Sequence, residues 1–209
     1  MNLVFIHEAG DDHRQWRRQR EFFGGSHAIL DVDLSRRSLR TEEAPAGFYE
    51  THAREVLRRM DAVRMARAVL VGHATGGAVA MTIAVGSPER VDALVLVATD
   101  GRLPPVSEAG EVAAVRAPAT RLARRATAHV ASRVHVRPAV AAIRAPTLVI
   151  GCHDPRNVTL QPAEALAASI AGAESLVLPD CGRHPEVEQE AAFTFNLEMF
   201  LGRFRIGRT

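Results

Sequence analysis

The sequence predicts an α/β fold in which helices cover both faces of one mostly parallel sheet. Short apolar runs recur along the chain, and each is followed by a polar or glycine-containing turn and then by a helical pattern. Near-continuous apolar runs of this length are typical of central strands that are covered on both faces. Their alternation with amphipathic segments therefore indicates a doubly wound sheet of about six strands.

Six runs are expected to form the strands, and four amphipathic segments are expected to form helices. At 209 residues, 47% of them hydrophobic, the chain is long enough for one well-buried core. We therefore expect a single domain over residues 1–209. The expected strands are residues 2–7, 27–34, 68–73, 93–100, 146–154 and 174–182, and the expected helices are 45–60, 75–85, 162–170 and 186–204.

Residues 101–144 interrupt the alternation of strands and helices. The stretch has no strand-like run, and after a proline-containing start it continues as an arginine-rich helical pattern. We interpret it as a small helical insertion that forms a lid. Its arginines favour two interpretations, either a lid that meets an anionic ligand such as a carrier-bound or coenzyme-A-bound acyl group, or a solvated helix face. The arginines are Arg102, Arg116, Arg121, Arg124, Arg125, Arg133, Arg137 and Arg144.

The overall composition indicates neither a nucleic-acid nor a membrane partner. The 26 basic and 24 acidic residues leave a formal net charge of +2, which gives no reason to expect a polyanionic partner. No apolar run reaches the roughly 18 residues that span a bilayer, and the first residues lack a secretory pattern. We therefore expect a cytoplasmic protein, in which Cys152 and Cys181 are reduced thiols.

One short segment has the pattern of a turn that presents a nucleophile. Residues 72–76 read Gly-His-Ala-Thr-Gly and lie between an expected strand and an expected helix. In such a turn the central residue has a strained backbone, so the residues two before and two after it must be small. The helix that begins at Thr75 would point its amino-terminal N–H groups and positive dipole end at the same place. The central residue here is Ala74, whose methyl group cannot attack a carbonyl.

Four segments together resemble the α/β-hydrolase superfamily. Residues 72–99 resemble that family's nucleophile turn with the helix and strand that follow it, and residues 5–16 resemble its oxyanion loop. Residues 145–157 resemble the strand and loop of the catalytic acid, and residues 178–201 the loop and helix of the catalytic histidine. The chain opens on the strand before the oxyanion loop, so the strands that usually precede it in the family are not expected.

The resemblance implies a role for each residue that matches the family pattern. Ala74 occupies the position of the nucleophilic serine, Asp154 that of the acid, with Asp100 as the alternative, and His184 that of the base. Arg183 stands where the family usually has its histidine, and His184 follows one position later, so the register of the base stays open. The expected oxyanion donors are Thr75 with Glu8 or Ala9, and the expected pocket residues are His7, His73, Trp16 and Arg183.

Several of these residues also have a purely structural interpretation. His7 and His73 can be packed or hydrogen-bonded histidines, and Trp16 can belong to the core. Cys152, His153, Cys181 and His184 are types that bind metals, but their spacing does not match a zinc motif, so no metal is expected. The resemblance implies no other cofactor.

The implied reaction is acyl transfer to water from a small ester, thioester or lactone, with the short lid favouring a small acyl group. Two explanations of Ala74 remain open. Either the chain is a hydrolase in which alanine replaces the serine and leaves an inactive or substrate-trapping form, or it is a natural protein that binds a ligand or performs lyase, isomerase or cyclase chemistry without a serine.

Overall fold

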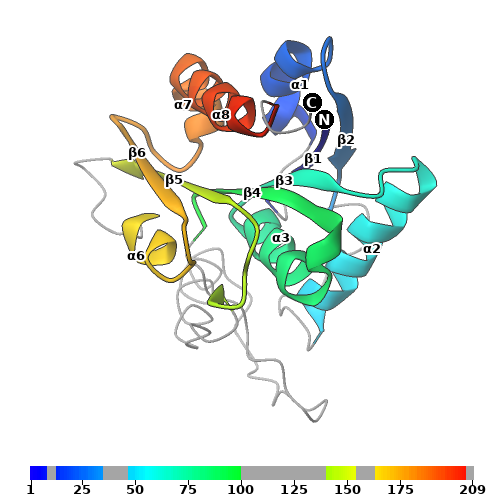
Figure 1. Cartoon of the computed structure of the whole chain (residues 1–209). Helices are drawn as coiled ribbons and strands as arrows, with labels where there is room; N and C mark the ends of the chain where they lie inside the picture. Colours follow the sequence, from blue (N-terminus) through cyan, green and yellow to red (C-terminus); the bar gives the residue numbers. More distant parts are fainter. Residues whose placement is uncertain (9–12, 35–46, 100–139, 154–162, 206–209) are drawn as a thin grey trace, which may run out of the picture.

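The structure, a computed structural model, describes residues 1–8, 13–34, 47–99, 140–153 and 163–205, which build a six-stranded sheet. The strand order is β2-β1-β3-β4-β5-β6, and every neighbouring pair is parallel (Figure 1). This confirms the predicted α/β sheet. The strands are β1 (Asn2–Ile6), β2 (Ala28–Val32), β3 (Ala68–His73), β4 (Val91–Val97), β5 (Thr147–His153) and β6 (Glu174–Pro179).

Helices cover both faces of the sheet (Figure 1). Helices α2 (Phe48–Ala62), α3 (Thr75–Gly86) and α6 (Ala163–Ala167) lie on one face. Helices α1 (Arg17–Phe23), α7 (Pro185–Glu188) and α8 (Glu190–Arg205) lie on the other. Two 3-10 turns, η1 (His13–Trp16) and η2 (Pro88–Arg90), complete the described elements. No helix of the described segments is long and apolar enough to cross a membrane.

Each central strand is apolar on both faces because its side chains point alternately into two hydrophobic clusters, one on each face of the sheet. In β1, Leu3 and Phe5 belong to the cluster under α1 and α8, whereas Val4 and Ile6 belong to the cluster under α2 and α3. Successive side chains of a strand point to opposite faces, so a run without polar positions is what a sheet covered twice requires. The apolar runs that predict the strands are thus explained by burial on both faces.

The parallel arrangement brings the carboxyl ends of the strands to one edge of the sheet. There β1 leads into His7 and Glu8, β3 into Ala74, and β6 into the loop that carries His184. Ligands of open α/β sheets bind outside this edge. The fold therefore gathers His7, Glu8, Ala74 and His184 from segments that are far apart along the chain.

Two elements differ from the sequence-based expectation. Residues 13–23 form η1 and α1, where no helix was expected, and the helix expected over residues 186–204 is divided into α7 and α8. The predicted lid at 101–144 lies outside the described residues except for its last five, and so do Asp100, Asp154 and Ala9.

Candidate active site

The turn between β3 and α3 holds Ala74 in a backbone conformation that is rare for any residue other than glycine. Its φ is 46° and its ψ is −109°. The Ala74 N–H donates to the carbonyl oxygen of Val97 over 2.9 Å, and its own carbonyl accepts from the N–H of Ala78 over 3.2 Å. Such a strained conformation persists only where the surroundings fix it, and it is typical of functional sites. The partly exposed methyl group of Ala74 is thereby fixed at the start of α3.

The glycines on both sides of Ala74 are required by close backbone contacts. A Cβ on Gly72 would lie 2.5 Å from the carbonyl oxygen of Gly76, and one on Gly76 would lie 2.2 Å from the carbonyl oxygen of Ile6. Neither contact can relax cheaply, because the atoms that would be hit belong to the backbone. The turn is therefore packed directly against the end of β1.

The amino terminus of α3 opens beside the end of β1. Thr75 is the first residue of α3, and the first N–H groups of a helix have no partner within the helix. These groups and the helix dipole favour negative charge at this point. His7, directly after β1, holds the main chain at this end of the strand through two hydrogen bonds. Its Nε2 accepts the N–H of Leu34 over 3.0 Å, and its Nδ1–H donates to the carbonyl oxygen of Glu8 over 2.7 Å. Asp33 Oδ1 also lies 3.1 Å from His7 Nε2.

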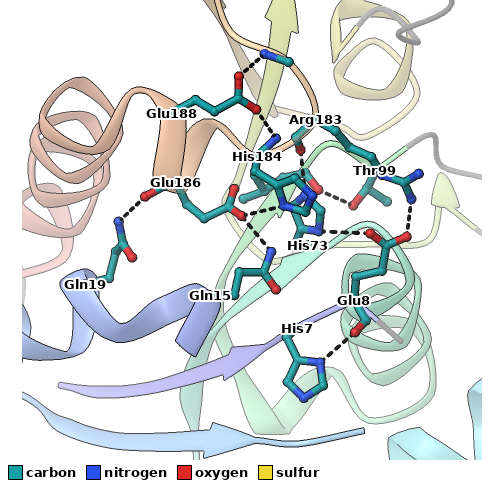
Figure 2. Close-up of polar contacts among 12 residues, drawn as sticks. His7, Glu8, Gln15, Gln19, His73, Thr99, Arg183, His184, Glu186 and Glu188 are labelled. Atoms are coloured by element: carbon teal, nitrogen blue, oxygen red, sulfur yellow. Dashed lines mark hydrogen bonds and ion pairs between the residues drawn. The ribbon is translucent and has the colours of Figure 1, made fainter. Parts of the chain in front are cut away.

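Two imidazole rings lie face to face next to this turn. The rings of His73 and His184 are stacked, with centroids 4.9 Å apart and planes inclined by 17°. His73 is fully buried, and its Nε2 lies 2.8 Å from the carbonyl oxygen of Arg183 (Figure 2). Because a carbonyl only accepts hydrogen bonds, this contact assigns a proton to Nε2. Within the described residues, Nδ1 of His73 has no hydrogen-bond partner, and Oε2 of Glu8 lies 3.9 Å away.

A buried carboxylate that the sequence analysis missed lies beside His184. Oε1 of Glu186 is 3.2 Å from Nδ1 of His184, and the Glu186 side chain is fully buried (Figure 2). The amide of Gln15 donates to the same Oε1 over 2.7 Å, and the amide of Gln19 donates to the Glu186 main-chain carbonyl over 2.9 Å. The only signal in the sequence was a glutamate two positions after the histidine at the start of a helix. The arrangement pairs an imidazole with a fixed carboxylate, as general base catalysis requires.

The loop that carries His184 is held by the next carboxylate along the chain. Glu188 accepts the main-chain N–H of Gly182 over 2.7 Å and that of His184 over 3.1 Å. Arg183 directs its guanidinium to the carboxylate of Glu8. Arg183 thus contributes its carbonyl to His73 and its side chain to Glu8, while His184 contributes the ring that lies between His73 and Glu186.

Other residues named from the sequence lie elsewhere. Trp16 is fully buried in the core, with its ring centroid 5.2 Å from that of Phe5 and 5.9 Å from that of Phe193. Cys152 and Cys181 are free thiols. Burial raises the pKa of both thiols above the ordinary value, so they are poor nucleophiles at neutral pH.

Solved structures with this fold cover nearly the whole chain. Est816, described as an N-acyl homoserine lactone degrading enzyme, superposes with a TM-score of 0.72 at 21% identity, over 96% of this chain and 93% of that one. The enol-lactonase from Burkholderia xenovorans LB400 superposes with a TM-score of 0.73 at 18% identity, over 96% of this chain and 91% of that one. These likenesses show the fold.

Two curated proteins are related in sequence. An acetyltransferase component of the acetoin cleaving system of Pseudomonas putida is 29% identical over 47% of this chain, but the match spans only 27% of that protein. RutD of Variovorax paradoxus (strain S110), named as a putative carbamate hydrolase, is 30% identical over 72% of this chain and 72% of its own length. No family model matches the chain. The parallel sheet, the turn at Ala74 and the relationship to RutD place the chain in the α/β-hydrolase superfamily.

Proposed function

We propose that the chain is an α/β hydrolase built for acyl transfer from a small ester, thioester or lactone, and that Ala74 leaves it without its nucleophile. The observation that carries the proposal is the turn itself. Ala74 keeps a strained conformation with φ 46° between β3 and α3, although an alanine has no chemistry that benefits from the strain. The strain costs of order 1–3 kcal/mol, and it has a purpose where a side-chain oxygen stands at this position.

The remaining roles follow from the contacts around the turn. A serine at position 74 would attack the carbonyl, and His184 would accept its proton. Glu186, 3.2 Å from His184 Nδ1, would hold the tautomer and stabilise the imidazolium, the role that the family resemblance assigns to Asp154 or Asp100. The N–H of Thr75 and one from Glu8 or Ala9 would stabilise the oxyanion.

With alanine at position 74 the expected activity is very low. In another hydrolase family, loss of the serine alone lowered turnover by about a millionfold. Substrate binding depends on the pocket rather than on one hydroxyl group, so the chain as it stands would bind an acyl substrate without turning it over.

A second candidate function is a binding or non-hydrolytic role. The Glu8 carboxylate forms an ion pair with Arg183 and lies 3.9 Å from Nδ1 of His73. A carboxylate next to the oxyanion position opposes the negative charge that develops during acyl transfer. This arrangement favours chemistry in which no oxyanion forms.

The Ala74→Ser variant separates the two candidates. Both proteins are checked for folding by circular dichroism and compared on short-chain esters, acyl thioesters and lactones. Because RutD is named as a carbamate hydrolase and the Pseudomonas putida relative as an acetyltransferase, carbamates and acetyl thioesters join the panel. We expect activity and covalent labelling by a fluorophosphonate in the serine form alone, and loss of activity when His184→Ala is added. A folded serine variant that is silent on every substrate and unlabelled would overturn the hydrolase proposal.

A further inference from the structure

We propose that His73, His184 and Glu186 form a binding site for a divalent transition-metal ion of the zinc class. Each of the three residues offers one ligand atom, and these atoms lie within 4.8 Å of one another. His73 comes from the end of β3, while His184 and Glu186 come from the loop and helix after β6. The site is thus assembled by the tertiary fold, and no local spacing in the sequence indicates it.

Two buried atoms in this cluster have lone pairs but no hydrogen-bond partner in the part of the chain that the structure describes. They are Nδ1 of His73 and Oε2 of Glu186, both on fully buried side chains. A buried acceptor without a partner costs about 1–3 kcal/mol, and more when it is charged. Nδ1 of His73 carries its lone pair because the hydrogen bond to Arg183 assigns the ring proton to Nε2. A cation bound between these atoms would satisfy both.

The ligand atoms would have to come closer together to coordinate a single ion. Zinc binds imidazole nitrogen at about 2.0–2.1 Å, so two ligand atoms at the tetrahedral angle lie about 3.4 Å apart. The present upper limit is 4.8 Å. Because the lone pair of an imidazole nitrogen lies in the ring plane, at least one of the two stacked rings would also have to turn out of the stack.

The charges and ligand types select the class of metal. Two imidazoles and a carboxylate suit zinc and its neighbours, whereas magnesium and calcium prefer oxygen ligands alone. Glu8 brings a second carboxylate to 3.9 Å from Nδ1 of His73, but it does not belong to the three-residue cluster and its other oxygen pairs with Arg183. The Nε2–H bond to the Arg183 carbonyl would orient His73 as outer partners orient metal-bound histidines.

The metal site does not depend on the proposed hydrolase function. It does share His184 with that function, because a ring nitrogen bound to metal cannot accept a proton from serine. Zinc is therefore expected to inhibit any activity that the Ala74→Ser variant regains, and a chelator is expected to restore it.

The primary test is metal binding by the unaltered, chelator-treated protein, measured by calorimetry with Zn²⁺ and by visible absorption with Co²⁺. We expect one tight equivalent and the intense absorption of four-coordinate Co²⁺. His73→Gln and Glu186→Gln should each weaken binding at least about tenfold. Two control variants, His153→Gln at the exposed end of β5 and Glu190→Gln on the surface of α8, should leave it unchanged.

A second measurement covers the case in which a variant fails to fold. X-ray absorption of the zinc-loaded unaltered protein should show scattering from two imidazoles and no sulfur. Absence of binding, tight binding that survives His73→Gln and Glu186→Gln, or a spectrum without imidazole scattering would each overturn the proposal. So would several weak equivalents distributed over surface residues, which would mean an adventitious ion only.

Discussion

Replacing Glu186 by glutamine in the Ala74→Ser background tests whether this carboxylate supports His184. The amide is nearly identical in size, and its NH₂ group takes the Oε1 position when the Gln15 amide, which donates to Oε1 over 2.7 Å in the unaltered protein, turns its own oxygen toward it. Its NH₂ group would then face Nδ1 of His184 and donate to it. That donation forces the imidazole proton onto Nε2, so the ring can no longer accept a proton from serine.

The expected magnitude follows from the contact that is lost. A hydrogen bond to a charged group contributes about 1.5–3 kcal/mol. The carboxylate stabilises the imidazolium only when that charge forms during the reaction, so the whole difference raises the barrier rather than weakening substrate binding. At about 1.4 kcal/mol per factor of ten, kcat should fall by about 10- to 150-fold, with KM nearly unchanged.

The assay compares kcat and KM of the Ala74→Ser protein with and without Glu186→Gln. Glu190→Gln in the same background is the matched control, because that carboxylate is 45% exposed and its ion-pair contact is with Arg18 on the surface. Thermal unfolding checks that each protein is folded. An equal kcat with and without Glu186→Gln, in proteins of equal stability, would refute the assignment and return the role of the acid to Asp154 or Asp100.

Two further predictions concern the scaffold. Gly76→Ala should lower the free energy of unfolding by about 1–3 kcal/mol, because its Cβ would lie 2.2 Å from a main-chain oxygen at the end of β1. The control is Gly86→Ala, whose Cβ would meet nothing within 4 Å and which should not lower the free energy of unfolding. Equal melting temperatures for the two variants would contradict this reasoning. Hydrogen bonds from Arg58 and then Arg59 lower the pKa of Glu55 to about 2. The stability that these contacts add is fully present above the ordinary carboxyl pKa and is lost as the pH falls toward 2. Glu55→Gln should therefore make the free energy of unfolding fall less steeply with decreasing pH at the acid end of the curve. An acid limb identical to that of the unaltered protein would contradict this prediction.

The strands were predictable because a sheet covered on both faces leaves a strong mark in the sequence. The six apolar runs contain the cores of all six strands. The segment at 13–23 left a weak mark, since only a few of its side chains are buried, among them Trp16, Gln19 and Phe23 in an otherwise charged stretch. Its buried side chains pack against α8 and β1, and these contacts cannot be inferred from the local sequence pattern.

The site was predictable only where backbone geometry dictates the residue type. A Cβ on Gly72 or Gly76 would lie only 2.5 or 2.2 Å from a main-chain oxygen, so only glycine fits at either position. The spacing of the two glycines therefore identifies the turn in the sequence. The partner of His184 is set by the direction in which side chains leave a short helix. Glu186 points inward to His184, whereas Glu188, two residues later, turns back to the main chain of the loop. Nothing in the sequence distinguishes these two glutamates.

With His184 in the proposed role of the base, its one-residue displacement from the family pattern is absorbed by the main chain. His73, next to Ala74 in the turn, donates its Nε2–H to the carbonyl of Arg183, and this bond fixes the position of the loop without using the Arg183 side chain. That side chain is free to turn outward to Glu8, and the following residue places its ring on His73 with centroids 4.9 Å apart. The loop is thus positioned by a carbonyl that every residue type provides. The identity of residue 183 can therefore vary while His184 stays beside the turn that holds Ala74.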